Sequence, residues 1–373
     1  MDSLPRVVLL AFDGLPLACL RPSVMPNLMR LAVGGGIAPG GGRSNFPSTT
    51  YPGFASLLTG AAPVRTGIRT TSSQAGAVPG WAGTDRCQVP TLIHVAKGAG
   101  LRVGAVMGDH KLQRVLMLDE IDEVWPPRAT VPTGTELDAH GYPTNAAIRD
   151  RVVEAALDPD LDLVFVHLNE TDTLGHDLGP TAPETVRCAR QADAIVGEMV
   201  EALAPDWDRT LIAVASDHDM STRLPLPPID PTSAHECAGL IDDWIPDGAA
   251  AWIRLMPGAD THMAIKHLGC LDGVEAWRWR KPNMLLLLAQ PGRTFAAPWI
   301  PDAGIHGSLC TGRTVAIVGG GHPDVGAIAE SLEARAPKLQ DWAPTLADVL
   351  GIELPAADGF DMLGACSELQ PAG

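Results

Sequence analysis

Short, mainly aliphatic runs alternate with segments of helical periodicity along most of the chain. Residues 7–12, 163–168 and 211–215 each show the pattern of a strand that is buried on both faces. Strands that alternate with helices predict an α/β fold with a mostly parallel sheet and helices on both faces. Further strands are expected at 102–107 and 315–318, and helices at 25–33, around 54–58, and at 91–100, 145–157, 183–203 and 344–350.

This pattern changes after residue 220. A proline-rich stretch at 224–231 precedes shorter segments that resemble a small strand–helix–strand–strand unit. We interpret residues 222–303 as an inserted α+β cap that selects the substrate, and residues 1–221 and 304–373 as a metal-binding catalytic core. The glycine-rich stretches at 34–42 and 319–321 match no complete phosphate-loop motif and are interpreted as turns. The cap elements are expected at 249–255, 261–271, 273–279 and 284–289.

Composition supports a large folded core and restricts the class of ligand. Hydrophobic residues make up 46% and charged residues 19% of the 373 residues, which excludes global disorder. The formal net charge of -17 would repel a polyanion, so duplex nucleic acid is not an expected partner. A small anionic substrate would need a local positive centre, and bound cations held by some of the acidic residues would supply one.

Cysteine usage and hydropathy bear on the compartment. The seven cysteines are widely spaced and form no Cys-x-x-Cys pair, so we expect buried, reduced thiols and no zinc ribbon. The N-terminus shows no signal-peptide pattern, and the apolar run at 284–289 is far too short to span a membrane. We therefore expect a cytoplasmic protein with no membrane partner.

Seven residues of metal-binding type are distributed over nearly the whole chain, close to the ends of the predicted strands. Their ligand atoms are carboxylate oxygens, imidazole nitrogens and one hydroxyl. Such a set suits two divalent ions that share an activated nucleophile, as in phosphoryl transfer. The candidate residues are Asp13, Thr50, Asp172, His176, Asp217, His218 and His306.

Each motif taken alone also has a structural explanation. Asp13 precedes a glycine, which is ordinary turn chemistry. Thr50 lies between prolines and before a predicted helix, so its hydroxyl could act as a helix cap. A single histidine such as His306 is more often a surface or core residue. No Gly-x-Ser-x-Gly elbow offers a serine nucleophile in place of Thr50.

In their order and spacing, these motifs resemble the alkaline phosphatase superfamily, above all its nucleotide pyrophosphatase/phosphodiesterase branch, with phosphonoacetate hydrolase close by. The resemblance extends over residues 7–363 and implies an alkaline-phosphatase-like fold. The Pro-x-x-Thr-aromatic-Pro stretch of that branch corresponds to residues 47–52 and makes Thr50 the nucleophile. The resemblance further implies two ions, with zinc favoured, one bound by Asp172, His176 and His306 and the other by Asp13, Asp217 and His218, with Thr50 bridging toward it.

Two departures from the branch concern the substrate pocket. The branch has Asn-His after its aromatic-Pro pair, whereas this chain has Gly53 followed by phenylalanine. The Lys-Asp-Lys-Leu stretch of phosphonoacetate hydrolases is reduced here to Gly-Asp-His-Lys-Leu, which retains only the second lysine as Lys111. Tyr51, Gly53 and Lys111 are accordingly the candidate substrate contacts.

The resemblance implies a two-metal hydrolase that cleaves a phosphodiester or nucleotide pyrophosphate through a covalent Thr50 intermediate. One alternative is a phosphonoacetate-type hydrolase that cleaves a C–P bond. Another, of a different class, is a non-catalytic metal-binding or partner-binding module on the same scaffold. A sulfatase is disfavoured because the chain has no Cys-x-Pro-x-Arg stretch. The expected partner is a small phosphorylated or phosphonate substrate.

Overall fold

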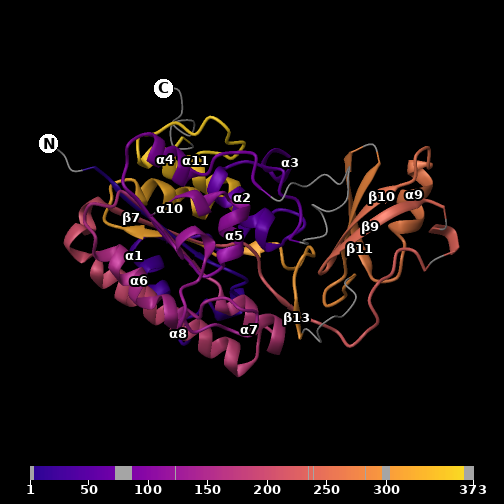
Figure 1. Cartoon of the computed structure of the whole chain (residues 1–373), viewed down its shortest axis with the longest axis horizontal. Coiled ribbons are helices and arrows are strands. Elements are labelled where there is room, and N and C mark those ends of the chain that lie inside the picture. The colour runs from indigo at the N-terminus through magenta and orange to yellow at the C-terminus, as the bar shows by residue number, and fades with distance from the viewer. Residues whose placement is uncertain are drawn as a thin grey trace.

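A seven-stranded sheet forms the centre of the molecule (Figure 1). The computed structural model describes residues 4–71, 86–121, 123–233, 235–237, 239–281, 283–295 and 303–364. The predicted α/β class with a mostly parallel sheet is confirmed. The strand order is β2 (Gly36–Ile37), β15 (Ala316–Gly320), β7 (Thr210–Ser216), β1 (Arg6–Phe12), β6 (Leu163–Leu168), β4 (Val103–Met107) and β5 (Val124–Trp125).

The central strand β1 is apolar over residues 7–12 because both of its faces are buried. Its side chains alternate between the two faces of the sheet, and both faces are covered by helices. Val7 and Leu9 belong to the hydrophobic core on one face, whereas Val8 and Leu10 belong to the core on the other. The run is apolar at every position because neither face meets water.

Helices cover both faces of the sheet, as the upper and lower groups in Figure 1 show. The first core is closed by α2 (Thr50–Thr59), α4 (Leu92–Gly98), α5 (His110–Val115), α10 (Val325–Ala334) and α11 (Leu339–Val349), with the short α3 (Pro63–Thr66) beside α2. The second is closed by α1 (Pro26–Gly34), α6 (Asn145–Leu157) and α8 (Pro183–Ala202), against which α7 (Glu170–Leu178) packs. Short 3-10 helices span Leu17–Cys19, Leu118–Glu120, Pro127–Ala129, Ala204–Arg209 and His235–Cys237.

Local structure differs from the sequence prediction at several places. Strand β15 is antiparallel to β7, and part of the predicted turn at 34–42 forms strand β2. The last helix starts at Leu339, five residues before the predicted start, and includes Pro344. The Asp341 carboxylate accepts a hydrogen bond from the amide of Lys338 and thereby begins the helix earlier than the proline suggested.

A second sheet of four strands, with helix α9 (Thr261–Leu268), forms the lobe on the right of Figure 1. Its order is β11 (Val274–Lys281), β12 (Met284–Ala289), β10 (Ala250–Leu255) and β9 (Ile241–Asp247). We did not predict β9, because its three aspartates and Pro246 hide the strand pattern. As an edge strand, β9 tolerates a proline.

Two short ribbons complete the strand list. Strand β8 (Ser221–Thr222) pairs antiparallel with β13 (Gly304–Ile305). The two segments that connect the predicted core to the predicted cap are therefore hydrogen-bonded to each other. Strand β3 (Gly42–Arg43) pairs with β14 (Arg313–Thr314). The division into a catalytic core and a substrate-selecting cap stays a prediction.

Cysteines and apolar helices were further sequence expectations. Of the cysteines in the described ranges, four are buried, but Cys270 and Cys310 are exposed, contrary to the expectation for them. Within those ranges, no helix combines the length and apolarity needed to cross a bilayer. The cytoplasmic location stays a prediction.

Candidate metal centre

Three adjacent parallel strands deliver most of the candidate site. Strand β1 lies between β6 and β7, and the chain passes from one side of β1 to the other when it goes from β6 to β7. In open α/β sheets, ligands bind beyond the carboxyl ends of the strands at such a switch point. Asp13 follows β1, and Asp217 and His218 follow β7. Asp172 lies in α7, the helix that follows β6.

The other candidate residues come from segments that lie across this edge. Thr50 is the first residue of α2, and His306 follows β13. The two segments are joined, because Ser48 forms a β-bridge with Gly307 and its hydroxyl donates to Ser308 O at 2.9 Å. His176 lies one helical turn after Asp172 on α7.

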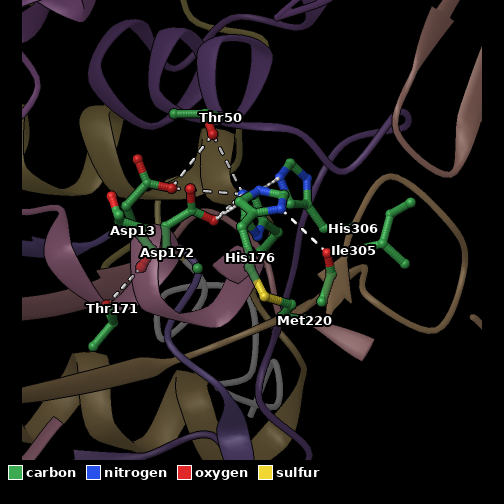
Figure 2. A network of polar contacts seen from close by, with 12 residues as sticks. Asp13, Thr50, Thr171, Asp172, His176, Met220, Ile305 and His306 are labelled. Atoms are coloured by element: carbon green, nitrogen blue, oxygen red, sulfur yellow. Dashed lines mark hydrogen bonds and ion pairs between the residues drawn. The ribbon is translucent and has the colours of Figure 1, made fainter. Parts of the chain in front are cut away.

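The structure brings the six predicted ligands into two contiguous groups. Figure 2 shows Asp13, Asp172, His176 and His306 among them. In each group the potential ligand atoms all lie within 4.8 Å of one another. The groups also meet: the His218 and His306 rings stack with centroids 3.7 Å apart, and Asp172 Oδ1 lies 4.0 Å from His218 Nε2. One group is Asp172, His176 and His306, and the other is Asp13, Asp217 and His218.

All three imidazoles are held by backbone carbonyls through their Nδ1 atoms. Nδ1 of His176 donates to Gly304 O at 3.2 Å, that of His218 to Asp219 O at 3.1 Å, and that of His306 to Ser48 O at 3.1 Å. This arrangement leaves Nε2 of each neutral ring with a lone pair that faces the centre. Metal-binding histidines are typically oriented in this way.

Several site atoms are buried without a partner that would satisfy them. Asp172 Oδ1 and Asp217 Oδ2 make no hydrogen bond to any of the described residues. Nε2 of His176 and Nε2 of His306 approach to 3.0 Å. Two lone pairs that face each other, beside unpaired carboxylate oxygens, are satisfied by a cation. The residues therefore fit the divalent ions that the donor types suggested.

Burial controls the charge of these groups when no cation is bound. Burial raises the pKa of Asp13 to about 8, and repulsion from Asp109 adds to this effect. Burial and then repulsion from Asp13 raise the pKa of Asp217. Burial lowers the pKa of His218 to about 4, so this imidazole is neutral at physiological pH. Metal binding would thus compete with protons on carboxylates and not on His218.

Thr50 lies beside the second group. Its Oγ1 is 3.3 Å from Asp13 Oδ1 and 3.4 Å from His218 Nε2 (Figure 2). The residue is 5% exposed, and it begins a ten-residue helix whose N-terminal dipole favours negative charge. The hydroxyl is thus placed where a cation held by Asp13 and His218 would favour its deprotonation.

The three candidate substrate contacts lie in different settings. Tyr51 is half-buried, and burial raises the pKa of its phenol above the usual range. Lys111 is exposed, with its Nζ 4.4 Å from the centre of the Tyr142 ring. The amide of Gly53 donates to Thr49 O at 3.0 Å, within the helix. A Cβ at position 53 would lie 2.9 Å from Asp217 Cβ, so glycine allows α2 to approach that residue.

Sequence reasoning missed residues that surround the ligands. His167 is fully buried in β6, and its Nε2 faces Asp13 Oδ2 at 3.4 Å while its Nδ1 accepts from the amide of Asp109 at 3.3 Å. His140 pairs with Asp177 at 2.9 Å, and its ring centroid is 6.5 Å from that of His176. A polar residue within a buried strand was the one available signal for His167.

Comparison with known proteins agrees with this geometry. The chain belongs to the type I phosphodiesterase / nucleotide pyrophosphatase family, whose sequence profile matches residues 7–269. Over an alignment of 89 residues, the chain is 37% identical to human ectonucleotide pyrophosphatase/phosphodiesterase family member 7. This alignment covers 22% of the chain and 19% of the human protein. Over an alignment of 240 residues, the chain is 28% identical to an uncharacterized pyrophosphatase/phosphodiesterase of Schizosaccharomyces pombe. This alignment covers 58% of the chain and 44% of the yeast protein. The matches thus span less than half of these relatives.

Solved structures share the fold over nearly the whole chain. Phosphonoacetate hydrolase from Sinorhizobium meliloti, in complex with phosphonoacetate, has a TM-score of 0.70 at 17% identity and covers 93% of this chain and 97% of its own. Murine ectonucleotide pyrophosphatase/phosphodiesterase 5 has a TM-score of 0.66 at 17% identity, covering 95% and 97%. An inactive threonine-to-alanine variant of that murine protein, in complex with AMP, has a TM-score of 0.66 at 16% identity, with the same coverage. The resemblance to the alkaline phosphatase superfamily is confirmed.

Metal binding is expected to release protons at neutral pH. Because the pKa of Asp13 is about 8 without a cation, this carboxyl is mostly protonated at pH 7 and is expected to lose its proton on binding a divalent ion such as zinc. The zinc affinity should therefore rise by about tenfold per pH unit between pH 6 and 8 for each proton released. Calorimetric titration of metal-free protein with zinc, in buffers of different ionisation enthalpy, measures the affinity and the number of protons released. An affinity that is independent of pH would contradict the assignment of Asp13.

A side chain at position 53 is expected to weaken the second group of ligands. The Cβ of a Gly53→Ala variant would force Asp217 or helix α2 to shift, because 2.9 Å is too short for two Cβ atoms. Zinc content after dialysis should fall below that of the wild type. Gly326→Ala, in α10, is the matched control, because a Cβ there meets nothing within 4 Å. Equal zinc retention by both variants would show that α2 need not approach Asp217 so closely.

Proposed function

We propose that the protein is a two-metal hydrolase that cleaves phosphodiesters or nucleotide pyrophosphates through a covalent intermediate on Thr50. The observation that carries the proposal is the position of the Thr50 hydroxyl, within 3.4 Å of both Asp13 and His218 and beside two contiguous ligand groups. Family membership and the fold support the reaction class.

Each of the two ligand groups would hold one divalent ion. Bound divalent ions, with zinc favoured, would neutralise phosphoryl oxygens and lower the pKa of a coordinated hydroxyl or water. Asp13, Asp217 and His218 would hold the ion next to Thr50. Asp172, His176 and His306, which form the first group, would hold the other ion.

Thr50 attacks phosphorus in line and forms a phosphothreonine ester while the leaving group departs with the bond electrons. Its place at the helix N-terminus favours the negative charge that develops on the phosphoryl group. Water then displaces the threonine oxygen and restores the free enzyme. The inactive threonine-to-alanine variant of the murine neighbour supports a threonine nucleophile in this fold.

A second candidate function is hydrolysis of the C–P bond of a carboxylated phosphonate. It is favoured by Lys111, whose ammonium group lies over the Tyr142 ring, where it could pair with a substrate carboxylate. Phosphonoacetate hydrolase as a structural neighbour supports the same reading. We rank it second because the family profile is that of the phosphodiesterases. A non-catalytic metal-binding or partner-binding module is the remaining alternative.

Removal of the Thr50 hydroxyl tests the nucleophile. Thr50→Ala should lower kcat for bis(p-nitrophenyl) phosphate by at least about a thousandfold, because no covalent intermediate can form. Thr50→Ser, which keeps a hydroxyl, should retain part of the activity. Zinc content measured by atomic emission should stay at two ions per chain in both variants. Full turnover by Thr50→Ala with two zinc ions bound would rule out this nucleophile.

Comparison of substrates separates the reaction classes. With zinc present, bis(p-nitrophenyl) phosphate and a dinucleotide should be hydrolysed at least about tenfold faster than p-nitrophenyl phosphate or phosphonoacetate. Lys111→Met should change diester turnover by less than about threefold. Arg114→Met, another exposed cation on α5, is the control. Preferred turnover of phosphonoacetate that collapses in Lys111→Met would establish the C–P hydrolase instead, and no turnover of any compound would favour the non-catalytic alternative.

A further inference from the structure

The small sheet contacts the candidate metal centre through the turn that joins β9 to β10. The amide of Ala249 donates to His306 O at 2.8 Å. Gly248 adopts a φ of 65°, and a Cβ there would lie 2.7 Å from the same carbonyl oxygen. This turn therefore packs directly on the backbone of a predicted metal ligand, and only glycine fits at position 248.

Asp247, the last residue of β9, extends this contact toward Thr50. The residue is 7% exposed, and its Oδ2 accepts hydrogen bonds from Thr49 Oγ1 at 3.3 Å and from the amide of Thr71 at 3.2 Å. Both donors belong to the part of the chain that precedes the small sheet. Burial raises the pKa of Asp247 to about 6, and the hydrogen bonds oppose that rise. A carboxylate with few water contacts depends on these donors.

The contact with Thr49 is unusual for its position. Thr49 is the N-cap residue of α2, where a threonine hydroxyl ordinarily accepts a hydrogen bond from a helix amide. Here the hydroxyl makes no capping bond and donates to Asp247 instead. The amide of Tyr51 donates to Thr71 Oγ1 at 3.2 Å. Asp247 thus holds one neighbour of Thr50 directly and the other through Thr71.

We propose that Asp247 is a positioning residue for the nucleophile: it fixes Thr49 and Thr71, and through them the direction of the Thr50 hydroxyl. The inference rests on the proposed function of Thr50. A reacting atom must lie within a few tenths of an ångström of its productive position, so loss of these contacts costs rate more than binding. A second contact of the small sheet, Trp252 Nε1 to Arg69 O at 3.1 Å, holds the segment that leads to Thr71.

Substitution of Asp247 provides the first test. Asp247→Ala should lower kcat for the best substrate of the wild type by about 10- to 100-fold and change KM by less than about threefold, with two zinc ions still bound. Asp247→Asn, which keeps one acceptor oxygen, should be intermediate. Asp243→Ala is the matched control on the same strand, because the Asp243 carboxylate pairs with Arg254 of β10. Its kcat should stay within about twofold of the wild type.

A double-mutant cycle then tests the contact itself. Thr49→Val removes the hydroxyl that donates to Asp247 and should lower kcat. Thr49→Ser keeps a hydroxyl and should have a kcat close to that of the wild type. Because Asp247 acts partly through Thr49, the double variant should lose less than the product of the two single effects. Thr49→Val also carries the test if Asp247→Ala does not fold.

The outcomes also separate this inference from the proposed function. An unchanged kcat in both Asp247→Ala and Thr49→Val, an effect confined to KM, or strictly multiplicative effects would overturn the positioning role. Activity that persists in Thr50→Ala would instead overturn the proposed function. If Thr50→Ala is inactive while Asp247→Ala and Thr49→Val are both fully active, Thr50 remains the proposed nucleophile and Asp247 has no positioning role.

Discussion

The crowding of three carboxylates, the fully buried Asp13 and Asp217 and the half-buried Asp172, at one edge of the sheet is the constraint on which the rest of the structure depends. Burial raises the pKa of Asp13, Asp172 and Asp217, and repulsion from Asp13 adds to the rise at the other two. Such an arrangement is unfavourable in a metal-free protein, because the carboxylates must either take up protons or repel one another. Cations remove the penalty. The three imidazoles, whose Nδ1 atoms bond to backbone carbonyls and whose Nε2 atoms face the same space, have the orientation that cation binding requires.

The parallel sheet makes this crowding possible. Adjacent parallel strands end at the same edge, so a residue that follows β1 lies close to residues that follow β6 and β7, although they are far apart in sequence. Helices on both faces bury the strands and fix their ends. Glycine at position 53 then lets α2 approach Asp217, which places the Thr50 hydroxyl at the edge where the predicted ligands meet.

The small sheet is structurally part of the same centre. Its β9–β10 turn contacts the backbone of His306, and Asp247 binds the residue that precedes Thr50. A shift of this lobe would therefore move together the segments that carry His306, a predicted metal ligand, and Thr50, the proposed nucleophile. Position 247 thus joins the lobe interpreted as the substrate-selecting cap to the residue next to Thr50, the proposed nucleophile.

Local pattern by itself determined the longer strands of the large sheet, most helices and the identity of the chemical groups, because burial on two faces demands apolar runs and divalent ions demand oxygen and nitrogen donors. The resemblance carried by motif order supplied the grouping of the ligands, which no spacing could give. Only the tertiary structure decided what depends on contacts between distant segments. It revealed His167 beside Asp13, the carbonyl partners of the imidazoles, and the turn of the Thr49 hydroxyl away from its helix toward Asp247. These features were invisible in the sequence because a hydrogen bond across 198 residues leaves no local pattern in either segment.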